Sequence, residues 1–317
     1  MRGSPVDPGL TTTPATGPEG ALATGTGLQV ALLGPLDVRV NGVRISDRAW
    51  RTSKASELLV LLVLDRDRAV SRDALIEALW PDSDLGSAVS NFHFTLHSLR
   101  KALSSAPGAA DSVAVVRRDR GYQLVTPGRI AADVDLFRLL MREAQDFQRY
   151  ARIDDAARLF RAATLLYRGD FAADLQNAWL RPHREELTRQ LLSALRQLAE
   201  IELERGDPLA AVPVCERFLR DEPYDENVHR LLLRAYHEAG DQGLVTRHYQ
   251  ALVALLRREL NEEPEAATVH LYERLRAGAP RRPGHRGAPA PLRLAPAGAS
   301  DRSPVATPAP LRLGMRG

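Results

Sequence analysis

The hydrophobic positions divide the chain into two folded regions that lie between two tails of low complexity. Residues 28–130 mix short alternating apolar runs with longer runs of helical spacing, which predicts an α+β domain. Residues 131–277 keep helical spacing throughout, which predicts an all-α domain. Residues 1–27 and 278–317 are rich in Pro, Gly, Ala and Thr. We expect both tails to be disordered, because they bury too little apolar surface to offset the entropy of ordering.

The first region begins with the pattern of a small antiparallel sheet. In LQVALLGPLDVRVNGVRI, two apolar runs flank Asn41-Gly42, the dipeptide preferred in two-residue hairpin turns. A mostly buried helix is predicted over 54–64, and a shorter one over 71–80 with Ser71 as its N-cap. A third helix follows, and SVAVVRRDRGYQLV then predicts two strands around a turn. Together these elements predict a winged helix-turn-helix.

The third helix, predicted over 88–103, has two unlike faces. One is an apolar stripe formed by Val89, Phe92, Leu96, Leu99 and Leu103. The opposite face carries Ser87, Ser90, Phe94, His97, Ser98 and Lys101, with Asn91, His93 and Arg100 on its flanks. This face has no carboxylate, whereas a solvated face usually mixes both signs. Short hydrogen-bonding groups, one aromatic ring and flanking cations suit the base edges and phosphates of a major groove. The alternative is a basic surface helix with Phe94 in an interdomain contact.

The predicted hairpin after this helix supports the DNA interpretation. Its turn at 117–121 presents Arg117, Arg118 and Arg120. In a helix-turn-helix the second helix of the pair enters the major groove, and a basic wing beside it straddles phosphates or enters the minor groove. Helix and hairpin therefore point to the same ligand, duplex DNA.

The second region contains an internal repeat. GDPLAAVPVCERFL begins at Gly206 and GDQGLVTRHYQALV at Gly240, a spacing of 34 residues, which is the period of tetratricopeptide helical hairpins. The helix between them places Leu232, Ala235 and Tyr236 on its packing side, and an earlier unit starts at Arg152. These apolar positions are interpreted as core rather than as a ligand site.

Charge is unevenly distributed although the net charge is only +3. Residues 28–130 hold 14 basic and 11 acidic side chains, whereas residues 131–277 hold 21 and 26. The second region is therefore unsuited to lie along a phosphate backbone. The final tail holds seven arginines, which would add nonspecific phosphate attraction or simply keep the tail soluble.

Several protein classes find no support in the sequence. No apolar run approaches the length of a membrane span, and MRGSPVDPGL lacks the apolar core of a signal peptide, so we expect a cytoplasmic, nucleoid-associated protein. The single Cys215 is expected to be a small buried hydrophobe. His93 and His97 are four residues apart, but no His-Glu-x-x-His, Gly-x-Ser-x-Gly or phosphate-binding loop accompanies them. We expect no enzymatic activity, cofactor or metal.

Ordered motifs in both regions resemble one known family. The run from SKASELLVLLVL to FHFTLHSLRKAL, followed by RRDRGYQL, is similar to the OmpR-type winged helix of the SARP (Streptomyces antibiotic regulatory protein) family. VDLFRLLMREAQ, AWLRPHREEL and the run from IELERGDPLAAV to LNEEPEAATVHLYERL resemble its bacterial transcriptional activator domain. The resemblance assigns 28–130 to a winged-helix DNA-binding domain and 131–277 to a tetratricopeptide-like activator domain. It implies an activator that binds direct repeats in promoter DNA as a homodimer and recruits RNA polymerase holoenzyme to a secondary-metabolite (antibiotic) gene cluster.

The resemblance also assigns contacts to individual residues. Recognition-helix contacts fall on Ser87, Ser90, Asn91, Phe94, His97 and Lys101, with Arg100 toward the DNA backbone and Arg117, Arg118 and Arg120 in the wing. Many relatives carry arginine where this chain has Ser98, so one phosphate contact would be lost or supplied elsewhere. Ser98 and the modest charge of residues 28–130 support an alternative function: a protein-interaction scaffold whose winged helix no longer binds DNA.

Overall fold

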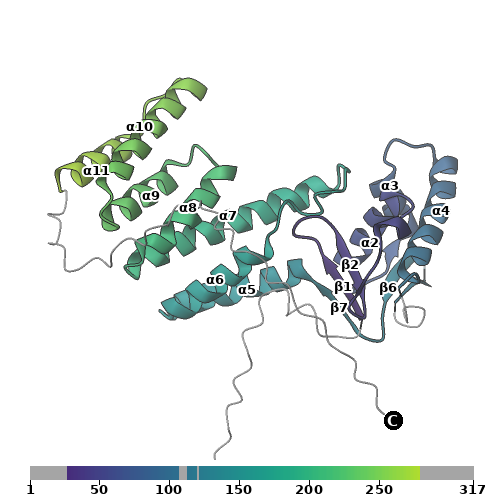
Figure 1. The fold of residues 1–317 in the computed structure, drawn as a ribbon. Coiled ribbons are helices and arrows are strands. Elements are labelled where there is room, and N and C mark those ends of the chain that lie inside the picture. The colour runs from purple at the N-terminus through teal and green to yellow at the C-terminus, as the bar shows by residue number, and fades with distance from the viewer. Residues whose placement is uncertain (1–26, 107–112, 120, 279–317) are drawn as a thin grey trace, which may run out of the picture. The chain divides into compact units, whose positions relative to one another are not determined.

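The computed structural model describes residues 27–106, 113–119 and 121–278. Nearly all of both tails that the sequence predicts to be disordered therefore lies outside the described residues, and so does Arg120. The predicted order of elements is confirmed: strands and three helices come first, and a helical region follows (Figure 1).

A four-stranded sheet opens the fold. Its strands are β1 (Gly27–Ala31), β2 (Asp37–Val40), β3 (Val43–Arg44) and β7 (Arg129–Ala132), in the order β3-β2-β1-β7. The predicted turn is confirmed, because Asn41 and Gly42 both have the positive φ, 50° and 80°, that a two-residue hairpin turn requires. Strand β7 contradicts the expectation of helices alone from residue 131. It forms by parallel pairing with the open edge of β1, and this tertiary contact leaves no alternating pattern in the sequence.

The winged helix-turn-helix is completed by three helices and a second sheet. The helices are α2 (Ser53–Leu64), α3 (Arg72–Leu79) and α4 (Leu85–Leu103), preceded by a 3-10 turn, η1 (Asp47–Ala49). Strands β4 (Val70–Ser71), β5 (Ala114–Arg118) and β6 (Gly121–Val125) pair in the order β4-β6-β5. The predicted cap is confirmed, since Ser71 Oγ accepts a hydrogen bond from the Ala74 amide at 3.2 Å.

Seven helices make up the second region. They are α5 (Asp133–Arg149), α6 (Ile153–Leu166), α7 (Leu180–Glu204), α8 (Pro208–Asp221), α9 (Glu226–Glu238), α10 (Gln242–Glu259) and α11 (Ala266–Ala277). Helices consecutive in the chain pack side by side, as in stacked helical hairpins (Figure 1).

The 34-residue repeat is confirmed in the backbone. Gly206 and Gly240 both adopt positive φ, 72° and 81°, and each ends its helix with the same pair of backbone hydrogen bonds. The next residues, Asp207 and Asp241, each cap the following helix with a side-chain oxygen. Ala151 makes the same helix ending at φ 55°, which confirms the start of the earlier unit.

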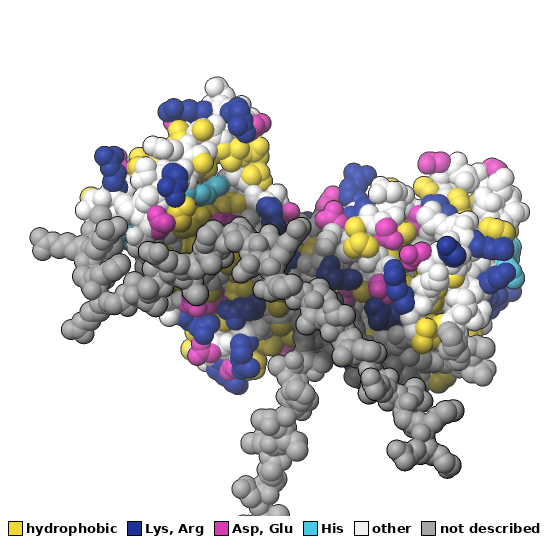
Figure 2. All heavy atoms as spheres, in the orientation of Figure 1, with side chains coloured by type: hydrophobic (Ala, Val, Ile, Leu, Met, Phe, Trp, Pro, Cys, Tyr) yellow, Lys and Arg dark blue, Asp and Glu magenta, His cyan; other side chains and the backbone are white. Residues whose placement is uncertain are grey.

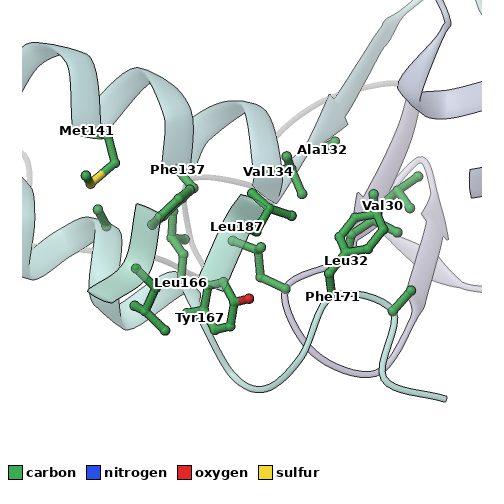
Figure 3. Packing of buried hydrophobic residues seen from close by; sticks show 14 of the residues in the cluster. Val30, Leu32, Ala132, Val134, Phe137, Met141, Leu166, Tyr167, Phe171 and Leu187 are labelled. Atoms are coloured by element: carbon green, nitrogen blue, oxygen red, sulfur yellow. The ribbon is translucent and has the colours of Figure 1, made fainter. Parts of the chain in front are cut away.

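Buried apolar side chains from both regions form a continuous core where β1 meets α5 (Figure 3). Val30 and Leu32 lie in the same cluster as Ala132, Phe137 and Phe171. Beside this cluster, the buried Asp133 carboxylate accepts hydrogen bonds from the amides of Leu32 and Leu33 at 2.7 and 3.0 Å. The first turn of α5 is thereby attached to the first sheet.

The segment between α6 and α7 forms a second attachment. We call residues 168–177 the strap. Its amides at Arg168 and Ala172 donate to carbonyls of the loop that follows β1, each at 2.8 Å. Arg184 of α7 donates to three strap carbonyls at 2.7 to 2.8 Å. The strap thus connects the helical region to the first sheet through backbone hydrogen bonds, which no periodicity in its sequence predicts.

Candidate nucleic-acid interface

Helix α4 exposes the face that the sequence assigns to DNA. The side chains Ser87, Ser90, Asn91, Phe94, His97 and Lys101 are all exposed, and α4 contains no carboxylate. We call these six residues the reading face. Phe94 leaves 54% of its surface accessible, which is unusual for a large apolar side chain. The structure therefore brings the predicted helix residues together on one open surface.

The two halves of α4 differ in burial. From Leu85 to Phe94 only Ala88 and Phe92 are buried, whereas the second half buries Thr95, Leu96, Ser98, Leu99, Ala102 and Leu103. Val89, predicted in the apolar stripe, is half-buried. The N-terminal half thus projects from the domain, and this is the part of a recognition helix that contacts bases.

Ser98 lies elsewhere than the sequence suggested. Its side chain is buried, with 1% of its surface exposed, because the core covers a wider arc of α4 toward its C-terminal end. Its hydroxyl has no hydrogen-bond partner among the described residues. The expected outward position is therefore wrong, and this residue is not where a phosphate contact would be lost.

Hydrogen bonds between neighbouring residues stabilise the first turns of α4. Asp84 caps the helix by accepting from the Ser87 amide at 3.0 Å, and hydrogen bonds from Ser87 hold the pKa of Asp84 below its usual value. Ser90 Oγ donates to the Gly86 carbonyl at 3.2 Å. In this position the Ser90 hydroxyl can still accept a hydrogen bond, but it must rotate away from its own helix before it can donate one to a base.

The wing is the β5–β6 hairpin. Arg117 and Arg118 are exposed at its end, and Asp119 in the turn has φ 50°. Gly121 is required by a close approach, since a Cβ atom there would lie 2.5 Å from the Val70 carbonyl oxygen of β4. The turn end of the wing is thereby held against β4, which precedes α3.

Two contacts connect α4 to the wing. Arg100 donates from Nε and Nη2 to the Val115 carbonyl of β5, at 3.2 and 2.8 Å. Phe92 meets Tyr122 of β6 edge to face, with ring centroids 5.1 Å apart. Reading face and wing consequently form one surface.

The cations of this surface are not neutralised by neighbouring carboxylates. Within the described ranges, no ion pair involves Arg100, Lys101, Arg117 or Arg118. Figure 2 shows basic and histidine side chains together along the edge of the molecule that α4 occupies in Figure 1. Such a surface attracts phosphates.

Outside this surface, the candidate chemistry consists of one thiol and possible metal ligands. Cys215 is buried, as predicted, and burial raises the pKa of its thiol to about 12, so it is unreactive. No group of three or more potential metal ligands occurs among the residues that the structure describes. In the same residues, every helix is too short or too polar to cross a membrane.

Sequence reasoning missed one buried histidine pair. His229 Nδ1 lies 2.8 Å from His248 Nε2, across the contact between α9 and α10. Burial lowers the pKa of both imidazoles, that of His248 to about 4. The two residues are far apart in the sequence and belong to different helices, so no motif signals their contact.

Two family descriptions match the chain. Residues 47–124 match "transcriptional regulatory protein, C terminal", and residues 132–276 match "bacterial transcriptional activator domain". The two matches divide between the winged helix and the helical region.

Similar proteins match across both regions. The chain is 27% identical over 253 residues to the transcriptional regulatory protein MoaR1 of Mycobacterium tuberculosis, covering 80% of each. It is 27% identical over 249 residues to the regulatory protein DnrI of Streptomyces peucetius, covering 77% of this chain and 90% of DnrI.

A solved structure has the same fold. The structure of Mycobacterium tuberculosis EmbR in complex with a low-affinity phosphopeptide superposes with a TM-score of 0.64 at 27% identity, over 80% of this chain and 66% of EmbR. By sequence, the match spans 63% of EmbR. EmbR therefore extends beyond the matched part.

Proposed function

This chain belongs to the SARP family of transcriptional regulators, and from that premise we propose that it is a promoter-specific activator that binds DNA through the reading face and the wing. The observation that carries the proposal is the exposed, acid-free N-terminal half of α4, joined to a wing whose arginines have no ion-pair partner among the described residues. Such a surface combines base-reading groups with phosphate-binding groups.

The residues divide between two tasks. Ser87, Ser90, Asn91, Phe94 and His97 read base edges, with Phe94 against a thymine methyl group. Lys101, Arg117, Arg118 and Arg120 hold phosphates, and Arg100 acts at the boundary between helix and wing. This division follows from the chemistry of the side chains: neutral donors and acceptors discriminate bases, whereas cations bind every sequence alike.

The partners follow from the family. The protein acts on direct repeats in promoter DNA as a homodimer, and the helical region orients the winged helix and presents a surface to RNA polymerase holoenzyme. The genes it activates belong to a secondary-metabolite cluster, and the protein works in the cytoplasm on the nucleoid. The acidic balance of residues 131–277 supports this arrangement, because it keeps the helical region off the DNA.

The scaffold alternative loses its main support. It rested on Ser98 as a lost DNA contact and on the modest charge of residues 28–130, but the Ser98 side chain is buried. If the protein were only a scaffold, the reading face and the wing arginines would have no role.

A gel-shift titration tests the proposal. Duplex fragments from upstream of the neighbouring genes are titrated with the full chain in the presence of random competitor DNA. We expect saturable binding to at least one fragment that resists the competitor. Absence of binding to every fragment at low salt would contradict DNA binding and favour the scaffold.

A further inference from the structure

Among the described basic residues of the candidate interface, Arg100 is the one whose guanidinium donates to the protein's own backbone, although the residue is exposed. Both Nε and Nη2 donate to a single acceptor, the Val115 carbonyl, at 3.2 and 2.8 Å. Lys101, its neighbour on α4, has no such bond among the described residues. Two N–H groups converging on one carbonyl need the planar fork of a guanidinium.

Val115 belongs to β5, the first strand of the wing, so its hydrogen bonds with Arg100 restrain the position of that strand. Among the described residues, strand β5 pairs only with β6 and forms an edge of the sheet order β4-β6-β5, so one side of its backbone has no strand partner there. Arg100 covers a carbonyl on such an edge. Arg118 follows three residues later in the same strand, about 10 Å further along at the rise of an extended chain. A constraint at Val115 therefore limits where the wing arginines lie relative to α4.

The other contact to the wing supports this geometry. Phe92 touches Tyr122 of β6 from a position two turns earlier in α4. The ring contact is apolar and non-directional along the strand, whereas the guanidinium bonds fix one backbone atom. Backbone pairing with β4 holds strand β6, and Arg100 supplies a directional restraint between α4 and strand β5.

From this arrangement we propose that Arg100 is a positioning residue, which sets the reach of the wing so that the wing arginines and the reading face engage the same stretch of duplex. It acts through Arg117 and Arg118 rather than mainly through a phosphate of its own. The inference rests on the proposed function, because it concerns how the same surface binds DNA.

A double-mutant cycle tests the proposal. The variants are Arg100→Lys, which keeps the charge but removes the fork, Arg118→Ala, and the two combined. The probe is a fluorescein-labelled duplex cut from the upstream fragment that binds in the titration above. Arg118→Ala should weaken binding of the otherwise unchanged protein about fivefold, and by less than about twofold in the Arg100→Lys background, since a displaced wing no longer uses Arg118.

A matched control uses the neighbouring cation. Lys101→Gln removes a charge from the same turn of α4 without touching Val115, so it should combine with Arg118→Ala independently, and the fold-changes should multiply. If Arg100→Lys is not folded by thermal unfolding, Arg100→Gln replaces it in the cycle, because its shorter side chain also lacks the two-nitrogen fork that bonds Val115.

The outcomes separate the two proposals. Independent effects of Arg100→Lys and Arg118→Ala, with the unchanged protein binding normally, would overturn the positioning role and leave DNA binding intact. No binding by the unchanged protein would instead overturn the proposed function itself. A cycle in which Arg118 matters only when Arg100 is present supports the inference.

Discussion

Asn91 and Arg118 lie on the same surface but offer DNA different chemistry. The Asn91 side chain carries a donor and an acceptor on an exposed turn of α4, a pairing that matches the major-groove edge of adenine. Arg118 offers a charge at the end of the wing, where a phosphate of any sequence satisfies it. Single substitutions at these two residues should therefore have different signatures.

Asn91→Ala should change sequence preference, at a cost of about 1 to 3 kcal/mol on the preferred duplex and little on random DNA. Arg118→Ala should weaken all duplexes alike and lower the slope of log K against log salt by about one unit. Anisotropy titrations on both duplexes at several salt concentrations measure these effects. Equal losses of affinity on specific and random DNA for both variants would show that the two residues do not divide between base contact and phosphate contact.

Asp119 is an acidic residue in the turn between the two wing strands. Its φ of 50° is a conformation that Asp and Asn tolerate better than most side chains. Asp119→Asn should keep the turn and remove a charge that repels phosphates, so binding to any duplex should strengthen by about threefold at low salt. Unchanged affinity for random DNA would show that the wing does not approach the DNA backbone.

At the scale of elements, the features that depend on sequence neighbours could be predicted, whereas those that depend on tertiary contacts could not. Asn41-Gly42, the Ser71 cap and the acid-free face of α4 depend on neighbouring residues, and all three are present in the structure. The burial of Ser98 depends instead on what packs over the end of α4, which no helical projection reveals. Arg100 was assigned to DNA, but its bond to Val115 requires knowing that β5 is an edge strand.

The contact between α9 and α10 should make the helical region sensitive to acid. Burial lowers the pKa of His229 and lowers that of His248 to about 4, below the ordinary value of about 6.5. Since a depressed pKa favours the neutral form in the folded state, the stabilisation is complete above about pH 6.5 and is lost as the pH falls toward 4.

Thermal unfolding at about pH 7 and pH 5 measures this effect. His248→Gln removes the titrating ring but keeps a side chain that can donate to His229, so its melting temperature should fall less on acidification than that of the unchanged protein. An identical fall in both proteins would show that other groups cause the acid sensitivity.

At the scale of the whole molecule, the two regions share backbone and core. The predicted division at residue 130 falls within strand β7, and Asp133 and the strap both bond to the loop after β1. Neither attachment could be predicted from sequence, because each joins segments a hundred or more residues apart. These hydrogen bonds attach the helical region to the first sheet.

Asp133→Ala should destabilise the protein by about 1 to 3 kcal/mol, because the buried amides of Leu32 and Leu33 lose their acceptor. Asp135→Ala is the matched control on the same helix. It removes a partly exposed ion pair with Arg66, 2.7 Å long, at a cost of about 0 to 1 kcal/mol. Urea unfolding measures the free energy of unfolding of both variants. Equal decreases would show that the hydrogen bonds of Asp133 do not stabilise the contact between α5 and the loop after β1.

If the N-terminal half of α4 enters a groove of duplex DNA, a cleaving label placed there should cut the DNA. The chain holds one cysteine, Cys215, which is buried and has a raised thiol pKa, so an added surface cysteine can be labelled selectively with an iron–EDTA reagent. The measurement is the pattern of DNA cleavage from a label at Asn91→Cys. It is compared with the pattern from a label at Asp154→Cys, whose position on α6 is exposed.

The label at position 91 should cut the bound upstream fragment at a single cluster of positions within the binding site, while the label at position 154 should leave the DNA intact. A bound complex in which the label at 91 cuts nothing, or in which the label at 154 cuts instead, would show that α4 does not enter the groove.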